Sequence, residues 1–313
     1  MLPIAEVYCY SFGTEPSAGL YKPRENKAIV QIKARTQVLD LPDRQLAYLE
    51  WNQGQEPLLL LHGMADHSLV WAELGDSLQD RYHILAPDLR GHGNSSKPSA
   101  GYRCVDIIAD LEALIAAQGW TSAHVVAHSW SAKVSLVWAQ QHSQALRSLV
   151  LVDPFFINQI PLWLKPTFPL LYHVLPFLKM LGPFATYAQA QQQAQKLKQY
   201  RGWSEWQQAV FEQNIEQKVD GTWASKFVPQ ARDEIFADVM EVAGLTSAIA
   251  IPTLFVQPKQ GLNRTAWQLQ PYHTYLQKLQ VTQVPGHHWC FLTEPIAFNQ
   301  AVAAFLDSQC SMT

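Results

Sequence analysis

The chain has 313 residues and a formal net charge of −3, from 23 Lys and Arg against 26 Asp and Glu. This balance gives no basic stripe for phosphates, so we expect no nucleic-acid partner. No apolar run approaches the length of a membrane span, and the first residues lack the basic and apolar regions of a signal peptide. The cysteines have neither metal-ligand spacing nor close pairs, which favours a reduced, cytoplasmic protein without metal or cofactor: Cys9, Cys104, Cys290 and Cys310.

Short apolar runs alternate with helical patterns along the first half of the chain. Residues 1–27 show no clear period, and residues 28–41 and 44–52 resemble two strands joined at Pro42 and Asp43. Buried strands are expected in PLLLLHG, YHILAPD, AHVVAHS and LRSLVLVDP, with helices at LVWAELGDSLQ, 105–118 and AKVSLVWAQQHS. Strands alternating with helices predict an α/β fold: a mostly parallel sheet with helices on both faces.

The pattern changes at Pro154. Residues 154–245 contain a Pro-punctuated apolar segment and several helical stretches without a strand pattern, and strands resume at IPTLFVQP and LQVTQVPGHH. We therefore expect one sheet domain formed by residues 1–153 and 246–313, with 1–27 as an N-terminal extension. The helical insertion at 154–245 is expected to pack over the core as a cap. The alternative is that its apolar segment contacts a membrane surface or a lipid substrate.

The segment AHSWSA contains a candidate nucleophile, Ser129. It directly follows a buried strand and precedes a helix, where backbone N–H groups favour developing negative charge. Ala127 and Ser131 flank it at two residues' distance, and small side chains suit the strained strand-to-helix turn of a nucleophilic serine. The alternative is a chance serine in a stretch of small residues.

A hydroxyl needs a base to remove its proton, and the best placed is His288, in the loop after the last predicted strand. The neighbouring His287 competes with it. The carboxylate that would orient the base is Asp153, at the carboxyl end of the strand next to that of Ser129. The alternative for Asp153 is a structural Asp-Pro turn. The loop QPKQGLNR after the seventh strand has no acid that could replace it.

An oxyanion hole requires two backbone N–H groups. The candidates are those of Trp130, directly after Ser129, and of Met64, where Gly63 allows a close backbone approach. Four further polar residues are interpreted as fixing loops rather than acting in catalysis: His62, Asp88, Arg90 and His92.

From about residue 45 onward the chain resembles the α/β-hydrolase superfamily. The landmarks are LLLLHGM, DLRGHGNS, AHSWSA and the histidine loop HHWCFLTEP. In relatives the catalytic His precedes the Pro of this last motif by seven residues, which implies His288. The acid often follows strand seven, where this chain has Gln260, but some members carry it after strand six, as Asp153 would be. The resemblance also implies a cap after strand six, matching 154–245.

Three functions are compatible with these residues. The leading hypothesis is a serine hydrolase (carboxylesterase or lipase-like) that cleaves a small or medium apolar ester, or a related carbon–carbon bond, through an acyl-enzyme. Epoxide hydrolases and haloalkane dehalogenases of this superfamily use an Asp nucleophile, so Ser129 argues against both. The alternatives are a cofactor-free dioxygenase acting on a heteroaromatic substrate, which resembles this chain in its A-H-S turn and its acid after strand six, and a non-catalytic binding protein.

Overall fold

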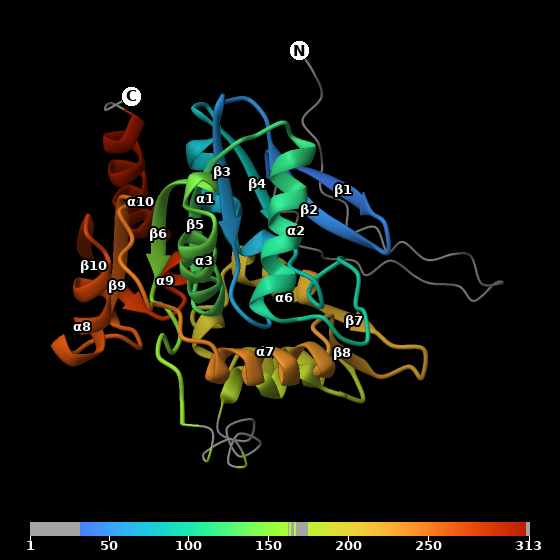
Figure 1. Ribbon diagram of the computed structural model, residues 1–313. Helices are drawn as coiled ribbons and strands as arrows, with labels where there is room; N and C mark the ends of the chain where they lie inside the picture. Colours follow the sequence, from blue (N-terminus) through green and yellow to red (C-terminus); the bar gives the residue numbers. More distant parts are fainter. Residues whose placement is uncertain (1–31, 162, 164–165, 167–174, 311–313) are drawn as a thin grey trace.

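An eight-stranded sheet forms the centre of the protein, in the order β1-β2-β4-β3-β5-β6-β9-β10 (Figure 1). The computed structural model describes residues 32–161, 163, 166 and 175–310. β1 and β2 are antiparallel to their neighbours, and the strands from β4 to β10 pair in parallel. The strands are β1 (Arg35–Leu41), β2 (Arg44–Trp51), β3 (Glu56–Leu61), β4 (Tyr82–Pro87), β5 (Ala123–His128), β6 (Leu146–Val152), β9 (Thr253–Gln260) and β10 (Leu279–His287).

The mostly parallel sheet predicted from the sequence is confirmed. The hairpin between β1 and β2 turns at Pro42 and Asp43, as expected. The first strand begins at Arg35, later than predicted, and its expected residues 28–31 lie outside the described residues together with the extension 1–27.

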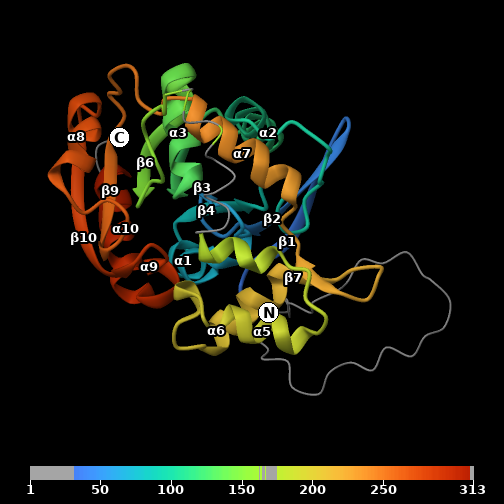
Figure 2. The same ribbon diagram turned by 90° about the horizontal axis from the view of Figure 1, so that it is seen from below.

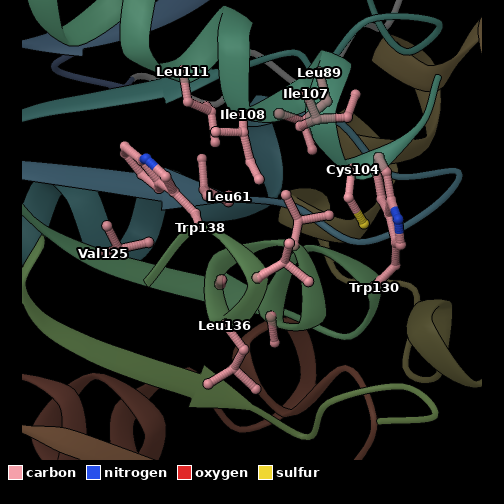
Figure 3. Packing of buried hydrophobic residues seen from close by; sticks show 14 of the residues in the cluster. Leu61, Leu89, Cys104, Ile107, Ile108, Leu111, Val125, Trp130, Leu136 and Trp138 are labelled. Carbon is pink, nitrogen blue, oxygen red and sulfur yellow. The ribbon is translucent and has the colours of Figure 1, made fainter. Parts of the chain in front are cut away.

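Alternating residues of the central strands enter two separate hydrophobic cores. In β3, Leu59 and Leu61 belong to one core, whereas Leu58 and Leu60 belong to the other. All four are fully buried, which is why the strand appears in the sequence as a continuous apolar run rather than an alternating one. The helices that cover the two faces are α2 (Cys104–Ala117), α3 (Trp130–Gln141) and α8 (Ala266–Tyr275) on the first, and α1 (Ala72–Leu78), α9 (Cys290–Thr293) and α10 (Pro295–Cys310) on the second. Figure 3 shows the first core where β3, α2 and α3 meet.

The segment 154–245 is mainly helical where it is described. Its elements are η4 (Pro176–Leu181), α5 (Tyr187–Ala194), η5 (Lys198–Tyr200), α6 (Glu205–Asn214), β7 (Ile215–Gln217), β8 (Trp223–Ser225) and α7 (Pro229–Glu241). The expectation that this segment has no strands is wrong, because β7 and β8 form a small antiparallel hairpin. Three-residue strands are too short to show an alternating pattern in the sequence.

The inserted segment lies at the carboxyl ends of the parallel strands (Figures 1 and 2). Its attachment to the sheet domain is partly polar. The fully buried Lys133 of α3 donates from Nζ to the carbonyl oxygens of Phe156, at 3.0 Å, and Val239. From α6, Asn214 donates to the carbonyl of Ala65, at 3.1 Å, in the loop after β3. These bonds connect the insertion to the loops at the edge of the sheet where the candidate residues lie.

Two short helical turns complete the described elements: η1 (Ser68–Trp71) directly before α1, and η2 (Ser143–Ala145) directly before β6. In the described ranges, no helix has the length and apolar character needed to cross a bilayer.

Candidate active site

Ser129 occupies the sharp turn between β5 and α3. Its backbone has φ 58° and ψ −115°, a conformation that residues other than glycine rarely adopt. The turn is held by bonds on both sides of the serine: its N–H donates to the carbonyl of Val152, at 3.0 Å, and its carbonyl accepts from Phe155, at 3.1 Å. A strained, doubly anchored serine at the start of a helix is the geometry that exposes a nucleophilic hydroxyl.

The two small residues that flank Ser129 are both fully buried, Ala127 in β5 and Ser131 in α3. The Ser131 hydroxyl accepts from the N–H of His128, at 3.1 Å. It also lies 2.9 Å from the carbonyl oxygens of Leu61 and His128, and it donates to one of them. Ser131 therefore ties the turn to the end of β3, so the absence of glycine here is compensated by hydrogen bonds.

His288 lies against Ser129. Its Nε2 is 2.9 Å from the Ser129 hydroxyl oxygen, and its Nδ1 is 2.7 Å from Oδ2 of Asp153. His287 does not compete for this place, because its Nδ1 accepts from the N–H of Trp289, at 3.3 Å. With Nδ1 donating to a carboxylate, the free lone pair of the His288 imidazole faces the serine, as a general base requires.

Asp153 is fully buried and is held by the loop after β9. The N–H of Leu262 donates to Oδ2 at 2.8 Å, and Asn263 donates to Oδ1 from its N–H at 3.1 Å and from Nδ2 at 3.0 Å. Burial raises the pKa of this carboxyl, but the hydrogen bond and charge of His288 and the bonds from the loop outweigh it and hold the pKa below its usual value. Asp153 is therefore a carboxylate that can stabilise a cationic His288.

The loop after β9 thus supplies donors rather than an acid. Asn263 is not among the residues that the sequence predicts for the site, because the sequence signal at this loop concerns a carboxylate and the loop has none. Its neighbour Gly261 allows the close approach, since a Cβ there would lie 2.7 Å from Oδ2 of Asp153. The signal that could have identified Asn263 is its position at the same edge of the sheet as the acid.

The two oxyanion candidates lie on either side of Ser129. Trp130 is the first residue of α3, where N–H groups have no carbonyl partner within the helix. Met64 is buried and follows Gly63, whose backbone comes so close to the turn that a Cβ would lie 3.3 Å from Cβ of Ser129. The loop after β3 and the start of α3 therefore both adjoin the serine.

We expect Gly63→Ala to lower kcat by about 10²-fold or more with little change in KM. A Cβ at this position would meet Nδ1 of the buried His128 at 2.6 Å, so the segment of Met64 must shift away from Ser129. Steady-state kinetics on any turned-over ester would measure the effect. Gly221→Ala, in the turn between β7 and β8, is the control: a Cβ there meets no atom within 4 Å, and the strain that alanine adds at its φ of 82° should lower stability but not kcat. An unchanged kcat in Gly63→Ala would remove Met64 from the site.

The loop-fixing interpretation agrees with the contacts that His62, Asp88, Arg90 and His92 make in the loops after β3 and β4. His62 is fully buried, donates from Nδ1 to the Gly63 carbonyl at 2.7 Å, and accepts the N–H of Leu89 at 2.9 Å. Burial lowers its pKa to about 4, so the ring is neutral, and its two hydrogen bonds connect the loops after β3 and β4. The remaining three make comparable bonds: Asp88 accepts from Ser68 and Asn94, Arg90 pairs with Asp110, and His92 donates to the Arg90 carbonyl.

A second polar group adjoins the site and was not a candidate in the sequence. Asp66, in the loop after β3, is almost completely buried and accepts from Nε1 of Trp289 at 3.1 Å. Its Oδ2 also lies 3.7 Å from Nδ1 of His128, the residue before the nucleophile. Burial raises the pKa of Asp66 to about 7 and the bond from Trp289 offsets only part of this. Asp66 lies outside the four sequence landmarks, and the landmarks that contain His128 and Trp289 assign no role to either residue.

The raised pKa of Asp66 predicts a pH-dependent stability. Between about pH 4, its pKa in an unfolded chain, and about pH 7, the folded state keeps a proton that the unfolded state has lost. The free energy of unfolding therefore falls across this range as pH rises. Asp66→Asn removes this contribution, so thermal melts should show the variant gaining stability relative to wild type between about pH 4 and about pH 8. A difference in Tm that does not change with pH would contradict the buried, neutral carboxyl.

A family model for the alpha/beta hydrolase fold matches residues 56–283 of this chain. The match covers more than half of the sequence and ends shortly before His288. The chain belongs to the α/β-hydrolase family. The resemblance inferred from the four sequence landmarks is thereby confirmed.

Curated relatives of this α/β hydrolase match parts of it. A haloalkane dehalogenase of Bradyrhizobium diazoefficiens is 34% identical over 119 residues, which cover 38% of each chain. Lipase 3 of a Moraxella species is 35% identical over 130 residues, covering 41% of this chain and 40% of the lipase. The chain thus matches about two-fifths of the length of these relatives. A solved structure of an E-2-(acetamidomethylene)succinate hydrolase superposes with a TM-score of 0.73 over 88% of this chain and 99% of its own, at 23% identity, and shares the fold.

Proposed function

We propose that this α/β hydrolase is a serine hydrolase that cleaves a small or medium apolar carboxylic ester, or a related carbon–carbon bond, through an acyl-enzyme. The observation that carries the proposal is the chain of contacts from Asp153 through His288 to the hydroxyl of Ser129, at 2.7 and 2.9 Å. A nucleophile, its base and the group that orients the base need this order and these distances.

The reaction proceeds in two halves. His288 takes the hydroxyl proton as Ser129 Oγ attacks the ester carbonyl, and the N–H groups of Met64 and Trp130 donate to the oxyanion. Collapse of the tetrahedral intermediate expels the alcohol, which receives the proton from His288, and leaves an acyl group on Ser129. Water, deprotonated by His288, attacks the acyl carbonyl. The acid leaves, and the proton returns to Ser129.

An apolar substrate is favoured by the aromatic side chains that pack beside the base His288. Trp289 meets His288 edge to face with ring centroids 4.8 Å apart, and Phe177 packs against Trp289 at 6.0 Å. Trp130 stacks on His92, which stacks on Phe227. Phe177 comes from the inserted segment 154–245, which we propose acts as a cap that contributes to the acyl or alcohol pocket, whereas Phe227 of the same segment is buried in the core.

A panel of p-nitrophenyl esters, from acetate through octanoate to palmitate, tests this function with Ser129→Ala as the blank. The proposal expects turnover that depends on acyl length and vanishes in the variant. The relative that is named a haloalkane dehalogenase suggests a second substrate class, but in the superfamily that chemistry uses an Asp nucleophile, and this chain has Ser129.

Oxygen consumption with a quinolone-type substrate separates the hydrolase from the cofactor-free dioxygenase. Uptake of oxygen that resists serine-directed inhibitors, without any ester turnover, would replace the proposal with that alternative. Absence of every activity and of any reaction at Ser129 would favour a binding protein.

A further inference from the structure

His128 links the nucleophile turn directly to the base. Its Nε2 lies 2.9 Å from the carbonyl oxygen of His288, and the two rings lie with centroids 4.4 Å apart. A carbonyl oxygen can only accept, so Nε2 of His128 carries the proton. In a neutral ring, Nδ1 then has a lone pair and no proton.

That lone pair faces another acceptor. Oδ2 of Asp66 lies 3.7 Å from Nδ1 of His128, and both side chains are buried. Among the described residues Nδ1 has no hydrogen-bond donor. Two buried acceptors that face each other repel unless one of them carries a proton. A proton on the Asp66 carboxyl removes this repulsion, although 3.7 Å is too long for a hydrogen bond to Nδ1. The carboxyl still accepts from Nε1 of Trp289 at 3.1 Å.

We infer that Asp66 faces His128 in its protonated form and that the two act as positioning residues for the base: the protonated Asp66 favours the His128 tautomer that keeps its proton on Nε2, and His128 holds the backbone of His288 beside Ser129. The inference rests on the proposed function, because it concerns how the base of that reaction is held. The contact with Trp289 strengthens it, since Trp289 follows His288 in the chain and thus ties the same segment to Asp66 from the other side.

Below about pH 7 the proton lies on Asp66 rather than on His128. Burial lowers the pKa of His128 well below its usual value and raises that of Asp66 to about 7. The other titratable groups that face the pair are Tyr200 of η5, whose pKa burial raises further, the neutral His62, and His288 itself. Above about pH 7 Asp66 ionises and loses the carboxyl proton that faces Nδ1 of His128, so it no longer fixes the tautomer of His128.

Paired variants at each residue test the inference, with the rate at which a fluorophosphonate labels Ser129 as the readout. His128→Gln keeps an N–H donor for the His288 carbonyl and His128→Met does not. We expect Met to slow labelling about tenfold or more and Gln to recover most of the rate. Asp66→Asn keeps an N–H group beside His128, whereas Asp66→Leu does not. We therefore expect Leu at this position to slow labelling more than Asn. His124→Gln, a buried histidine of the same strand β5, is the control, and thermal melts confirm that each variant is folded.

The pH dependence provides a readout that a merely structural role would not change. The ratio of the wild-type rate to the Asp66→Asn rate should be constant in acid and fall about threefold or more as pH rises through about 7. If the wild type labels, three results would overturn the inference. These are a rate ratio that does not change with pH, labelling of His128→Met as fast as the wild type, and equal labelling rates for His128→Met and His128→Gln. A wild-type chain that does not label at all would overturn the proposed function and the inference with it.

Discussion

Ser129→Ala should lower kcat for any hydrolysed ester by at least about 10⁴-fold and leave the fold intact. The hydroxyl is the group that Nε2 of His288 approaches to 2.9 Å, and no other hydroxyl is bonded to that nitrogen among the described residues. Ser129 is only 8% exposed and sits at φ 58°, where alanine has about the same backbone strain as serine. Stopped assays at high enzyme concentration, together with thermal melts, measure both quantities.

Ser131→Ala is the matched control for this change. Its hydroxyl is only two residues further along the chain, but it bonds to His128 and to the end of β3 rather than to His288. We expect it to cost stability and little of the chemistry. Comparable losses of kcat in both variants would show that the turn as a whole, and not the Ser129 hydroxyl, supports activity.

Asp153→Asn should lower kcat by about 10⁴-fold, the second large effect. Both carboxylate oxygens of Asp153 accept from donors: Oδ2 from Leu262 and His288, and Oδ1 twice from Asn263. An asparagine must place its NH₂ group against one of these pairs. If the amide faces His288, the ring takes the wrong tautomer and presents an N–H to Ser129. If it faces Asn263, two buried donors meet.

Asn263→Ala separates these two causes. It removes a donor to Oδ1 but leaves the carboxylate and its bond to His288, so we expect a loss that is small beside that of Asp153→Asn. Asp43→Asn, at an exposed carboxylate, serves as the control for the change of charge. A kcat of Asp153→Asn within a few-fold of wild type would mean that another group orients His288.

The sequence predicted the parts of the fold that depend on local pattern. The central strands β3, β5 and β6 are buried on both faces, so each appears as a continuous apolar run. Parallel strands end at one edge of the sheet, so Ser129, Asp153 and His288 could be expected to meet there although 159 residues separate the serine from the histidine. Their hydrogen bonds follow from topology and not from any long-range signal in the sequence.

Contacts between loops could not be predicted in the same way. The bond of Asn263 to Asp153 and the approach of Asp66 to His128 each join side chains from loops with no shared period. They depend on the final packing of the loops, which also buries Asp66 and thereby raises its pKa. The hairpin of β7 and β8 has no sequence signal for a different reason, since each strand has only three residues.

Covalent trapping tests the central claim most directly. The wild-type chain is incubated with a fluorophosphonate, digested, and its peptides are analysed by mass spectrometry, with Ser129→Ala and His288→Gln treated in parallel. We predict a single stoichiometric adduct on Ser129, no adduct in the alanine variant, and a strongly slowed reaction in the glutamine variant. An adduct on another residue, or labelling of Ser129→Ala at the wild-type rate, would contradict the assignment of Ser129 as the nucleophile.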